Sequence, residues 1–159
     1  MTKVGHNYRH IGIFLLTLHK TFKVCKMKKG EYVEKNKAFL EEIRKQAEVK
    51  ELRGGILYKV LKSGEDERPV NPRSIVTCHY RGSLINGKVF DDSYARKCPE
   101  AFRVNQLISG FQIALTNMHI GDHWMVYIPS EMGYGERGAG RDIPGHSTLI
   151  FEIELIGIG

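Results

Sequence analysis

A glycine-rich segment, residues 133–138, matches the spacing G-x-G-x-x-G with which many nucleotide-binding loops hold a phosphate. In those loops the backbone amides at the start of a helix donate the hydrogen bonds, so a helix must follow the glycines. Here the chain continues as "GAGRDIPG", and its glycines and proline do not begin a helix. The sequence therefore argues against a phosphate site and favours the rim of an apolar pocket.

Aromatic and aliphatic residues gather in three segments that lie far apart in the sequence. The glycine-rich segment carries Tyr134 and leads to Phe151, "VFDDS" places Phe90 beside Asp91, and "QLISGF" ends in Phe111. Each aromatic residue taken alone is more typical of a core than of a site. Together they are typical of a concave apolar site with few polar groups.

Groups for other kinds of chemistry are not found at useful spacings. The sequence shows no Ser-His-Asp set, no paired carboxylates and no metal-ligand cluster, and its seven histidines are scattered. His79 lies in a strand pattern and is expected to be a sheet residue rather than a base. We therefore expect neither a metal nor a cofactor.

Alternating apolar residues predict strands around the candidate pocket residues. This period of two runs through "GILYKVLKSG", "SIVTCHYRGSLINGKVF", "DHWMVYIP" and "STLIFEIELIGIG". Asn86-Gly87 is a strong hairpin signal, and "SGFQIALTNM" predicts one short helix. These elements predict an α+β domain over residues 54–159, in which an antiparallel sheet is covered on one face.

An amphipathic helix is predicted ahead of the sheet, over residues 31–53. Apolar residues of "AFLEEIRKQA", among them Ile43 and Ala47, recur at helical spacing. The pair Gly54-Gly55 is expected to end this helix. We expect the helix to pack on its own domain as a monomer, with pairing in a homodimer as the alternative.

The first 30 residues are predicted to be a basic tail, disordered or not translated. They hold seven Lys or Arg and no acid, whereas the rest of the chain holds 17 basic and 18 acidic residues, so the net charge of +6 belongs to the tail. Translation from Met27 is one hypothesis, and a weak export signal is another. The apolar run at residues 11–18 is far shorter than the roughly 20 residues of a membrane span. We expect no transmembrane segment and no nucleic-acid function; tail binding to phosphate or lipid would be salt-sensitive.

The three cysteines, Cys25, Cys78 and Cys98, show neither metal-site nor C-x-x-C spacing. Cys78 lies inside an apolar strand pattern and is predicted to be a small buried hydrophobic residue. A reducing compartment fits this use of cysteine. We expect the cytoplasm, with the periplasm or cell envelope as the alternative if the tail is an export signal.

Residues 55–159 resemble the FKBP-type peptidyl-prolyl cis-trans isomerases, which bind tacrolimus and rapamycin. The resemblance is carried by "VTCHYRGSLINGKVFDDS", "GFQIALTNMHIGDHWMVYIPSEMGYGERGAG" and "IPGHSTLIFEIEL". The segments "YARKCPEAFRV" and "GYGERGAG" are similar to the bacterial branch related to the macrophage infectivity potentiator. The resemblance implies a twisted antiparallel sheet wrapped around a short helix.

The resemblance also implies roles for individual residues. Asp91, Tyr134 and Tyr80 match catalytic positions, and Arg96 matches a partner of the pocket aspartate. The remaining matched positions bind the substrate: Phe90, Leu107, Ile108, Phe111, Ile143 and Phe151. Among them, the backbone amide of Ile108 is the expected hydrogen-bond donor to a ligand. Phe111 stands where other members have an indole ring that forms the floor of the pocket.

Departures from the family pattern lie at the rim of the implied pocket. Glu100 stands where many members have an aromatic residue, Ala139 where some have histidine, and Asp142 where some have isoleucine. Gly145 replaces the second proline of a common Pro-Pro pair. These changes predict a more acidic and more mobile rim.

The implied function is rotation of X-Pro bonds in unfolded or nascent polypeptides, which assists protein folding. A non-catalytic proline-binding or chaperone module is the alternative. Partners implied by the resemblance are proline-containing chains and macrolides such as tacrolimus.

Overall fold

The computed structural model describes residues 27–159. The predictions made for residues 1–26, including the properties of the basic tail and of Cys25, lie outside the described residues. The elements in chain order are α1 (Lys29–Arg44), β1 (Val49–Leu52), β2 (Ile56–Lys62), β3 (Ile75–Leu84), β4 (Val89–Asp92), β5 (Glu100–Arg103), α2 (Ser109–Leu115), β6 (His123–Ile128) and β7 (Leu149–Ile158). None of the helices in this part of the chain is long and apolar enough to cross a membrane.

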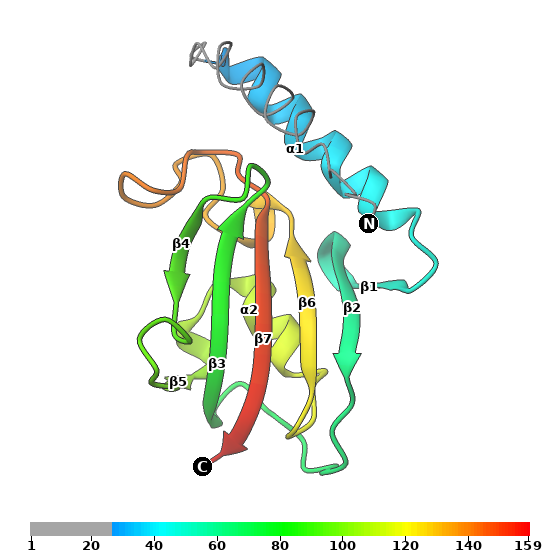
Figure 1. Cartoon of the computed structure of the whole chain (residues 1–159), viewed down its shortest axis with the longest axis vertical. Coiled ribbons are helices and arrows are strands. Elements are labelled where there is room, and N and C mark those ends of the chain that lie inside the picture. Colours follow the sequence, from blue (N-terminus) through cyan, green and yellow to red (C-terminus); the bar gives the residue numbers. More distant parts are fainter. Residues whose placement is uncertain (1–26) are drawn as a thin grey trace, which may run out of the picture.

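The strands form one antiparallel sheet in the order β1-β2-β6-β7-β3-β4 (Figure 1), and β5 also pairs with β3. The hairpin between β3 and β4 turns at Asn86-Gly87, as predicted, with a φ of 85° at Gly87. In the register of the sheet, Gly82 of β3 lies opposite Asp91 of β4 on one side and Phe151 of β7 on the other. Residues from three distant segments thus meet at the middle of β3.

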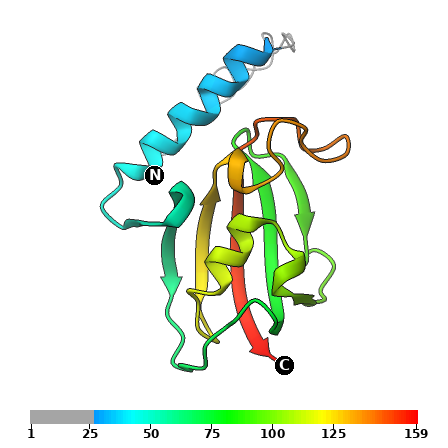
Figure 2. The same ribbon diagram turned by 180° about the vertical axis from the view of Figure 1, so that it is seen from behind.

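The core lies between the sheet and α2, which crosses one face of the sheet (Figure 2). Alternate residues of β7 are buried, and Phe151, Ile153 and Leu155 point to the same face as α2. This confirms the predicted α+β fold, a twisted antiparallel sheet wrapped around a short helix. Cys78 is fully buried in this core, as predicted.

Gly110 allows α2 to lie directly on β6. A Cβ atom at this position would stand 2.3 Å from Cγ2 of Ile128, far inside van der Waals contact. The close approach lowers the helix onto the sheet, so the neighbouring residue Phe111 is only 4% exposed.

The N-terminal helix is shorter than predicted: α1 ends at Arg44 rather than near residue 53. Residues 49–52 form β1, which pairs with β2 across the turn that contains Gly54 and Gly55, both with positive φ. The glycine pair is therefore a hairpin turn instead of a helix end. Ala47, placed on the apolar helix face by periodicity, lies beyond the helix and is exposed.

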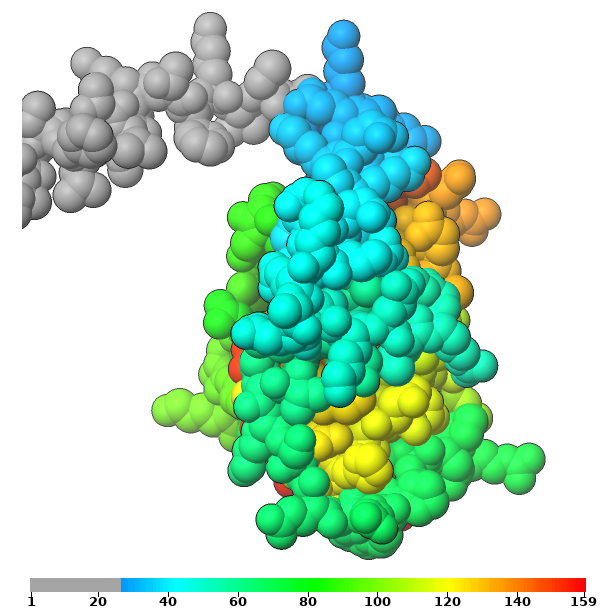
Figure 3. All heavy atoms as spheres, turned by 90° about the vertical axis from the view of Figure 1, so that its right-hand side faces the viewer, coloured from blue at the N-terminus to red at the C-terminus, as the bar shows by residue number. Residues whose placement is uncertain are grey.

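The helix α1 packs on one end of its own domain (Figure 3), next to β1 and β2. The ring of Phe39 lies 6.1 Å from the ring of Tyr127 on β6, and Ile43 is buried. The predicted apolar face of the helix, as far as Ile43, therefore contacts the sheet.

Candidate functional site

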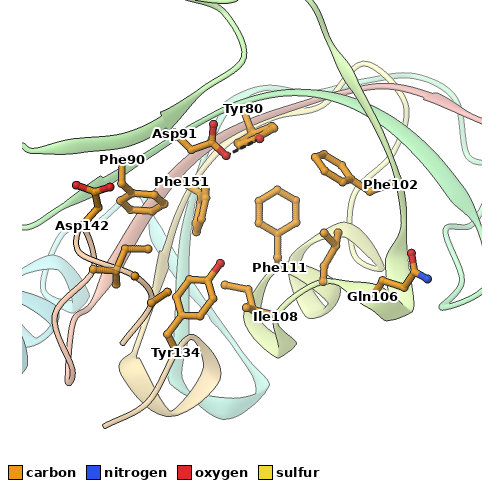
Figure 4. A pocket seen from close by; sticks show the side chains of 14 residues that line it. Tyr80, Phe90, Asp91, Phe102, Gln106, Ile108, Phe111, Tyr134, Asp142 and Phe151 are labelled. Atoms are coloured by element: carbon orange, nitrogen blue, oxygen red, sulfur yellow. Dashed lines mark hydrogen bonds between the residues drawn. The ribbon is translucent and has the colours of Figure 1, made fainter. Parts of the chain in front are cut away.

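A cavity of about 540 Å³ opens between α2, the middle of the sheet and the loop that joins β6 to β7 (Figure 4). This volume lies within the range of small-molecule sites. Every residue that the sequence assigned to the site lines the cavity, except Arg96. The lining consists of Tyr80, Phe90, Asp91, Phe102, Gln106, Leu107, Ile108, Phe111, Tyr134, Ala139, Gly140, Asp142, Ile143 and Phe151.

The floor of the cavity is a set of perpendicular aromatic rings. The ring of Phe111 lies 5.0 Å from that of Phe151, and Phe151 lies 5.6 Å from Phe90, both pairs edge to face. The ring of Phe111 also meets Tyr80 edge to face at 6.2 Å. Such pairs contribute about 0.5–1.5 kcal/mol each beyond the area that they bury. The floor is therefore a rigid apolar surface suited to a small saturated ring.

One edge of the cavity is polar and is held together by hydrogen bonds. The Tyr80 hydroxyl donates to Oδ2 of Asp91 at 2.6 Å, and the Arg96 guanidinium donates to Oδ1 of Asp91 at 2.6 Å. Arg96 also donates to the Tyr80 hydroxyl oxygen at 3.1 Å. Asp91 is thus fixed by two donors on its two oxygens. Arg96 lies behind the edge and acts on the cavity through these two residues.

The same contacts shift the pKa values of both groups. Burial of the Asp91 carboxyl works to raise its pKa, but the hydrogen bonds from Tyr80 and Arg96 outweigh burial and hold the pKa below its usual range. Burial, together with the hydrogen bond to Asp91, raises the pKa of the Tyr80 hydroxyl. At neutral pH the edge therefore holds an ionised carboxylate beside a protonated phenol.

Tyr134 and Ile143 line the cavity from the loop between β6 and β7. The ring of Tyr134 lies across from the Tyr80–Asp91 edge (Figure 4). Tyr134 is 39% exposed, and its hydroxyl forms no hydrogen bond with any residue between 27 and 159. Ile143 is buried and forms an isolated bridge with Ala139, with N···O distances of 2.9 and 3.1 Å. The loop therefore presents one fixed aliphatic side chain and one phenol that is free to meet a ligand.

The start of α2 supplies a backbone donor at the cavity. Ile108 precedes the helix in an extended conformation, and Leu107 and Ile108 both line the cavity. Among the described residues the Ile108 amide has no hydrogen-bond acceptor. An acceptor on a bound molecule would satisfy it. The contact with a ligand that the resemblance implies for this amide stays a prediction.

The acidic residues at the rim are paired with basic ones. Glu100 accepts a hydrogen bond from Arg96, and the Asp142 carboxylate lies 2.8 Å from the Lys88 ammonium. Glu100 does not line the cavity, whereas Asp142 does. Of the two predicted rim acids only Asp142 lines the cavity, and each of the two has a neighbouring counter-charge.

Two lining residues, Phe102 and Gln106, were missed by the sequence analysis. Phe102 lies on β5, with its ring 5.5 Å from that of Tyr80, and Gln106 lies in the turn before α2. The alternation in "EAFR" is a weak strand signal that could have placed Phe102. Gln106 directly precedes the predicted pocket residues Leu107 and Ile108, but its own polar side chain gave no reason to place it in an apolar lining. Between residues 27 and 159, no group of three or more His, Cys, Asp or Glu residues is placed to hold a metal ion.

A sheet that wraps one short helix and encloses an aromatic pocket between them is the fold and site on which a comparison with known families can be based. The chain belongs to the FKBP-type peptidyl-prolyl cis-trans isomerase family, because the sequence model of that family matches residues 66–156. This confirms the family resemblance that the sequence motifs carried.

Relatives from the bacterial branch match most of the chain. It is 46% identical over 120 residues to the FKBP-type 22 kDa peptidyl-prolyl cis-trans isomerase of Escherichia coli, covering 76% of this chain and 58% of that protein. It is 42% identical over 125 residues to the peptidyl-prolyl cis-trans isomerase Mip of Coxiella burnetii, covering 79% and 54%. The chain thus spans about half the length of these curated relatives.

A crystal structure of a peptidyl-prolyl cis-trans isomerase from Pseudomonas syringae matches the fold with a TM-score of 0.77 at 36% identity, covering 84% of this chain and 97% of that one. The structure of FkpA from Escherichia coli matches with a TM-score of 0.76 at 36% identity, covering 81% of this chain and 60% of that one.

Proposed function

We propose that this chain accelerates cis-trans isomerisation of X-Pro bonds in unfolded or nascent polypeptides. The observation that carries the proposal is the pairing of a rigid aromatic floor with a fixed Tyr80–Asp91 edge in one cavity. The floor accepts the proline ring, and the polar groups around it meet the amide on either side. Membership of the FKBP-type family supports this assignment.

The chemical problem is the loss of amide resonance during rotation. The barrier to rotation about a peptide bond is about 18–20 kcal/mol, because the planar amide is stabilised by charge separation between nitrogen and oxygen. Water stabilises that separated charge. A floor whose rings at Phe111 and Phe151 are 4% and 5% exposed excludes water from one side of a bound amide. The planar form loses stabilisation relative to the twisted form, and the barrier falls.

The polar groups have separate tasks in this proposal. The Ile108 amide binds a substrate carbonyl and holds the chain in register. The Asp91 carboxylate, fixed by Tyr80 and Arg96, polarises the twisted amide, and the Tyr134 hydroxyl binds a polar edge of the substrate. No proton transfer and no covalent intermediate are required. Tacrolimus, which binds members of this family, is expected to compete for the same floor.

The test is the cis-to-trans relaxation of a short X-Pro peptide with the full chain and two matched variants. Asp91→Asn keeps the shape of the side chain and removes its charge. We expect this change to lower kcat/KM about tenfold, or about 1.4 kcal/mol. Asp92→Asn is the control, because Asp92 pairs with Arg81 at 3.6 Å and does not line the cavity. Tacrolimus should abolish the wild-type rate.

A folded wild-type chain that leaves the relaxation rate unchanged would overturn the proposal. Tacrolimus binding without acceleration would then favour the non-catalytic proline-binding module.

A further inference from the structure

A buried amide side chain joins α1 to the loop that forms one wall of the cavity. Asn36 lies in the middle of α1 and is 3% exposed. Its Oδ1 accepts a hydrogen bond from the backbone N–H of Thr148 at 2.7 Å, and its Nδ2 donates to the carbonyl oxygen of Tyr32 at 2.8 Å. The first of these bonds joins residues 112 positions apart in the sequence. It ties the helix to the point where the loop enters β7.

A second contact lies one helical turn earlier on the same face of α1. The Tyr32 hydroxyl is 2.8 Å from Oγ of Ser147, and Ser147 donates to the carbonyl oxygen of Pro144 at 2.6 Å. Because the serine hydroxyl has a single hydrogen, which it gives to Pro144, Tyr32 is the donor to Ser147. A chain of hydrogen bonds therefore runs from the helix to the residue next to Ile143 of the cavity.

Backbone hydrogen bonds inside the loop connect the residues held by α1 to the residues that line the cavity. The N–H of His146 donates to the carbonyl oxygen of Gly135 at 2.8 Å, which fixes the segment next to Tyr134. The bridge between Ala139 and Ile143 fixes the far part of the loop. Displacement of residues 147–148 would therefore move both side chains that the loop presents to the cavity, Tyr134 and Ile143.

The opposite side of the loop has a weaker attachment. Lys88 of the β3–β4 hairpin pairs with Asp142, but their side chains are 48% and 65% exposed. Exposed ion pairs contribute little because water and salt compete with them. The contacts with α1 are shielded: Ser147 and Thr148 are 3% and 2% exposed. The helix is therefore the firmer support of this wall.

The choice of side chain at position 36 also indicates more than helix packing. Asparagine is a poor helix former, and a buried amide is costly unless its hydrogen bonds are made. An apolar residue at this position would leave the buried N–H of Thr148 without an acceptor. Asn36 thus acts as a specific backbone partner for the start of β7.

We propose that α1 is part of the isomerase site, and that Asn36 and Tyr32 are positioning residues for the wall formed by Tyr134 and Ile143. The proposal rests on the isomerase function proposed above. Neither residue touches the cavity, and both act through residues 144–148. Loss of either contact leaves the floor and the Tyr80–Asp91 edge intact and loosens only the loop.

The experiment uses the full chain with Tyr32→Phe and Asn36→Leu, and with Glu34→Gln as a control on the exposed side of α1. Isomerisation of an X-Pro peptide is measured well below each melting temperature. Amide hydrogen exchange is measured in the loop, residues 133–146, and in β3 and β7. Tyr32→Phe removes one hydroxyl and is the variant expected to fold in every case.

We expect Tyr32→Phe to lower kcat/KM roughly threefold to tenfold, the equivalent of about one hydrogen bond, and Asn36→Leu to lower it further. Exchange in the loop should rise by a similar factor, while exchange in the middle of β3 stays unchanged. A merely structural helix would lower the melting temperature and raise exchange everywhere without changing the rate per folded molecule.

Unchanged loop exchange in both variants would overturn the positioning role, and so would unchanged kcat/KM in an active wild type. If the wild-type chain has no isomerase activity, the proposed function fails, and loop exchange still decides whether α1 holds the loop.

Discussion

The two walls of the cavity are held in place by different parts of the chain. The sheet wall carries Phe90, Asp91 and Phe151 on paired strands. Asp91 and Phe151 both lie opposite Gly82 in the sheet register, and Phe90, at the irregularity of β4, packs its ring against Phe151 at 5.6 Å. The loop wall carries Tyr134 and Ile143, which are held by turns and by contacts from α1. The sheet wall is therefore a product of the fold itself, whereas the loop wall depends on an element outside the sheet.

This difference separates two kinds of contribution to catalysis. A site that binds a ring needs an invariant floor, and strands and a short helix supply one. A loop can carry further groups to the rim of such a floor, but contacts outside the sheet must then hold the loop in place. The structure places the Asp91 charge on the sheet wall and the Tyr134 hydroxyl, which has no hydrogen-bond partner between residues 27 and 159, on the loop wall.

The largest effect is expected from emptying the floor with Phe111→Ala. Phe111 is 4% exposed and contacts Phe151 and Tyr80, so its removal leaves a cavity that the rigid sheet cannot close. Substitutions of this kind cost about 3–5 kcal/mol of unfolding free energy. Urea unfolding measures the loss, and tacrolimus binding should fall with it. A loss below about 1 kcal/mol would show that the floor is less rigid than the ring contacts indicate.

How far the sequence predicted these walls depends on how local the signal was. The strands were predictable because residues such as Phe151 and Ile153 alternate with polar ones, and the hairpin because Asn86-Gly87 favours one turn geometry. The positions of the pocket residues came from the family motifs, which carry the spacing of the whole domain.

Features that depend on contacts between distant residues could not be predicted from the sequence. The segment Val49–Leu52 continues a helical pattern, and only its pairing with β2 makes it a strand. Asn36 looks like one more polar helix residue, since its partner Thr148 is 112 positions away. The same holds for Phe102, whose role in the lining depends on the pairing of β5 with β3.

A sharper comparison of the walls removes one tyrosine hydroxyl from each. Tyr80→Phe takes a donor from Asp91 and should cost about 1–2 kcal/mol of stability, because hydrogen bonds to charged groups are among the stronger ones. Tyr134→Phe removes a hydroxyl without a partner among the described residues, so stability should stay within about 0.5 kcal/mol.

The activity of Tyr134→Phe should fall although its stability is unchanged, so a loss of activity need not follow a loss of stability. Tyr134→Phe is expected to lower kcat/KM about twofold to fivefold, less than 1 kcal/mol, because the lost contact is made only with substrate. Paired thermal melts and peptide assays measure both quantities. Equal stability losses in the two variants would remove the distinction between the walls.

The smallest effect is a pH dependence of stability that belongs to the sheet wall alone. Tyr80 and Arg96 hold the pKa of the folded Asp91 carboxyl below its usual range, which in an unfolded chain is about 3.9. A group with a lowered folded pKa contributes stability in full above the unfolded pKa, and this contribution disappears as the pH falls through the folded pKa. The difference in melting temperature between wild type and Asp91→Asn should therefore be constant from about pH 7 to pH 5 and shrink below about pH 4.

Asp142→Asn on the loop wall is the matched control, since its exposed pair with Lys88 contributes little at any pH. A difference for Asp91→Asn that persists unchanged at pH 3 would mean that the carboxylate charge does not stabilise the sheet wall.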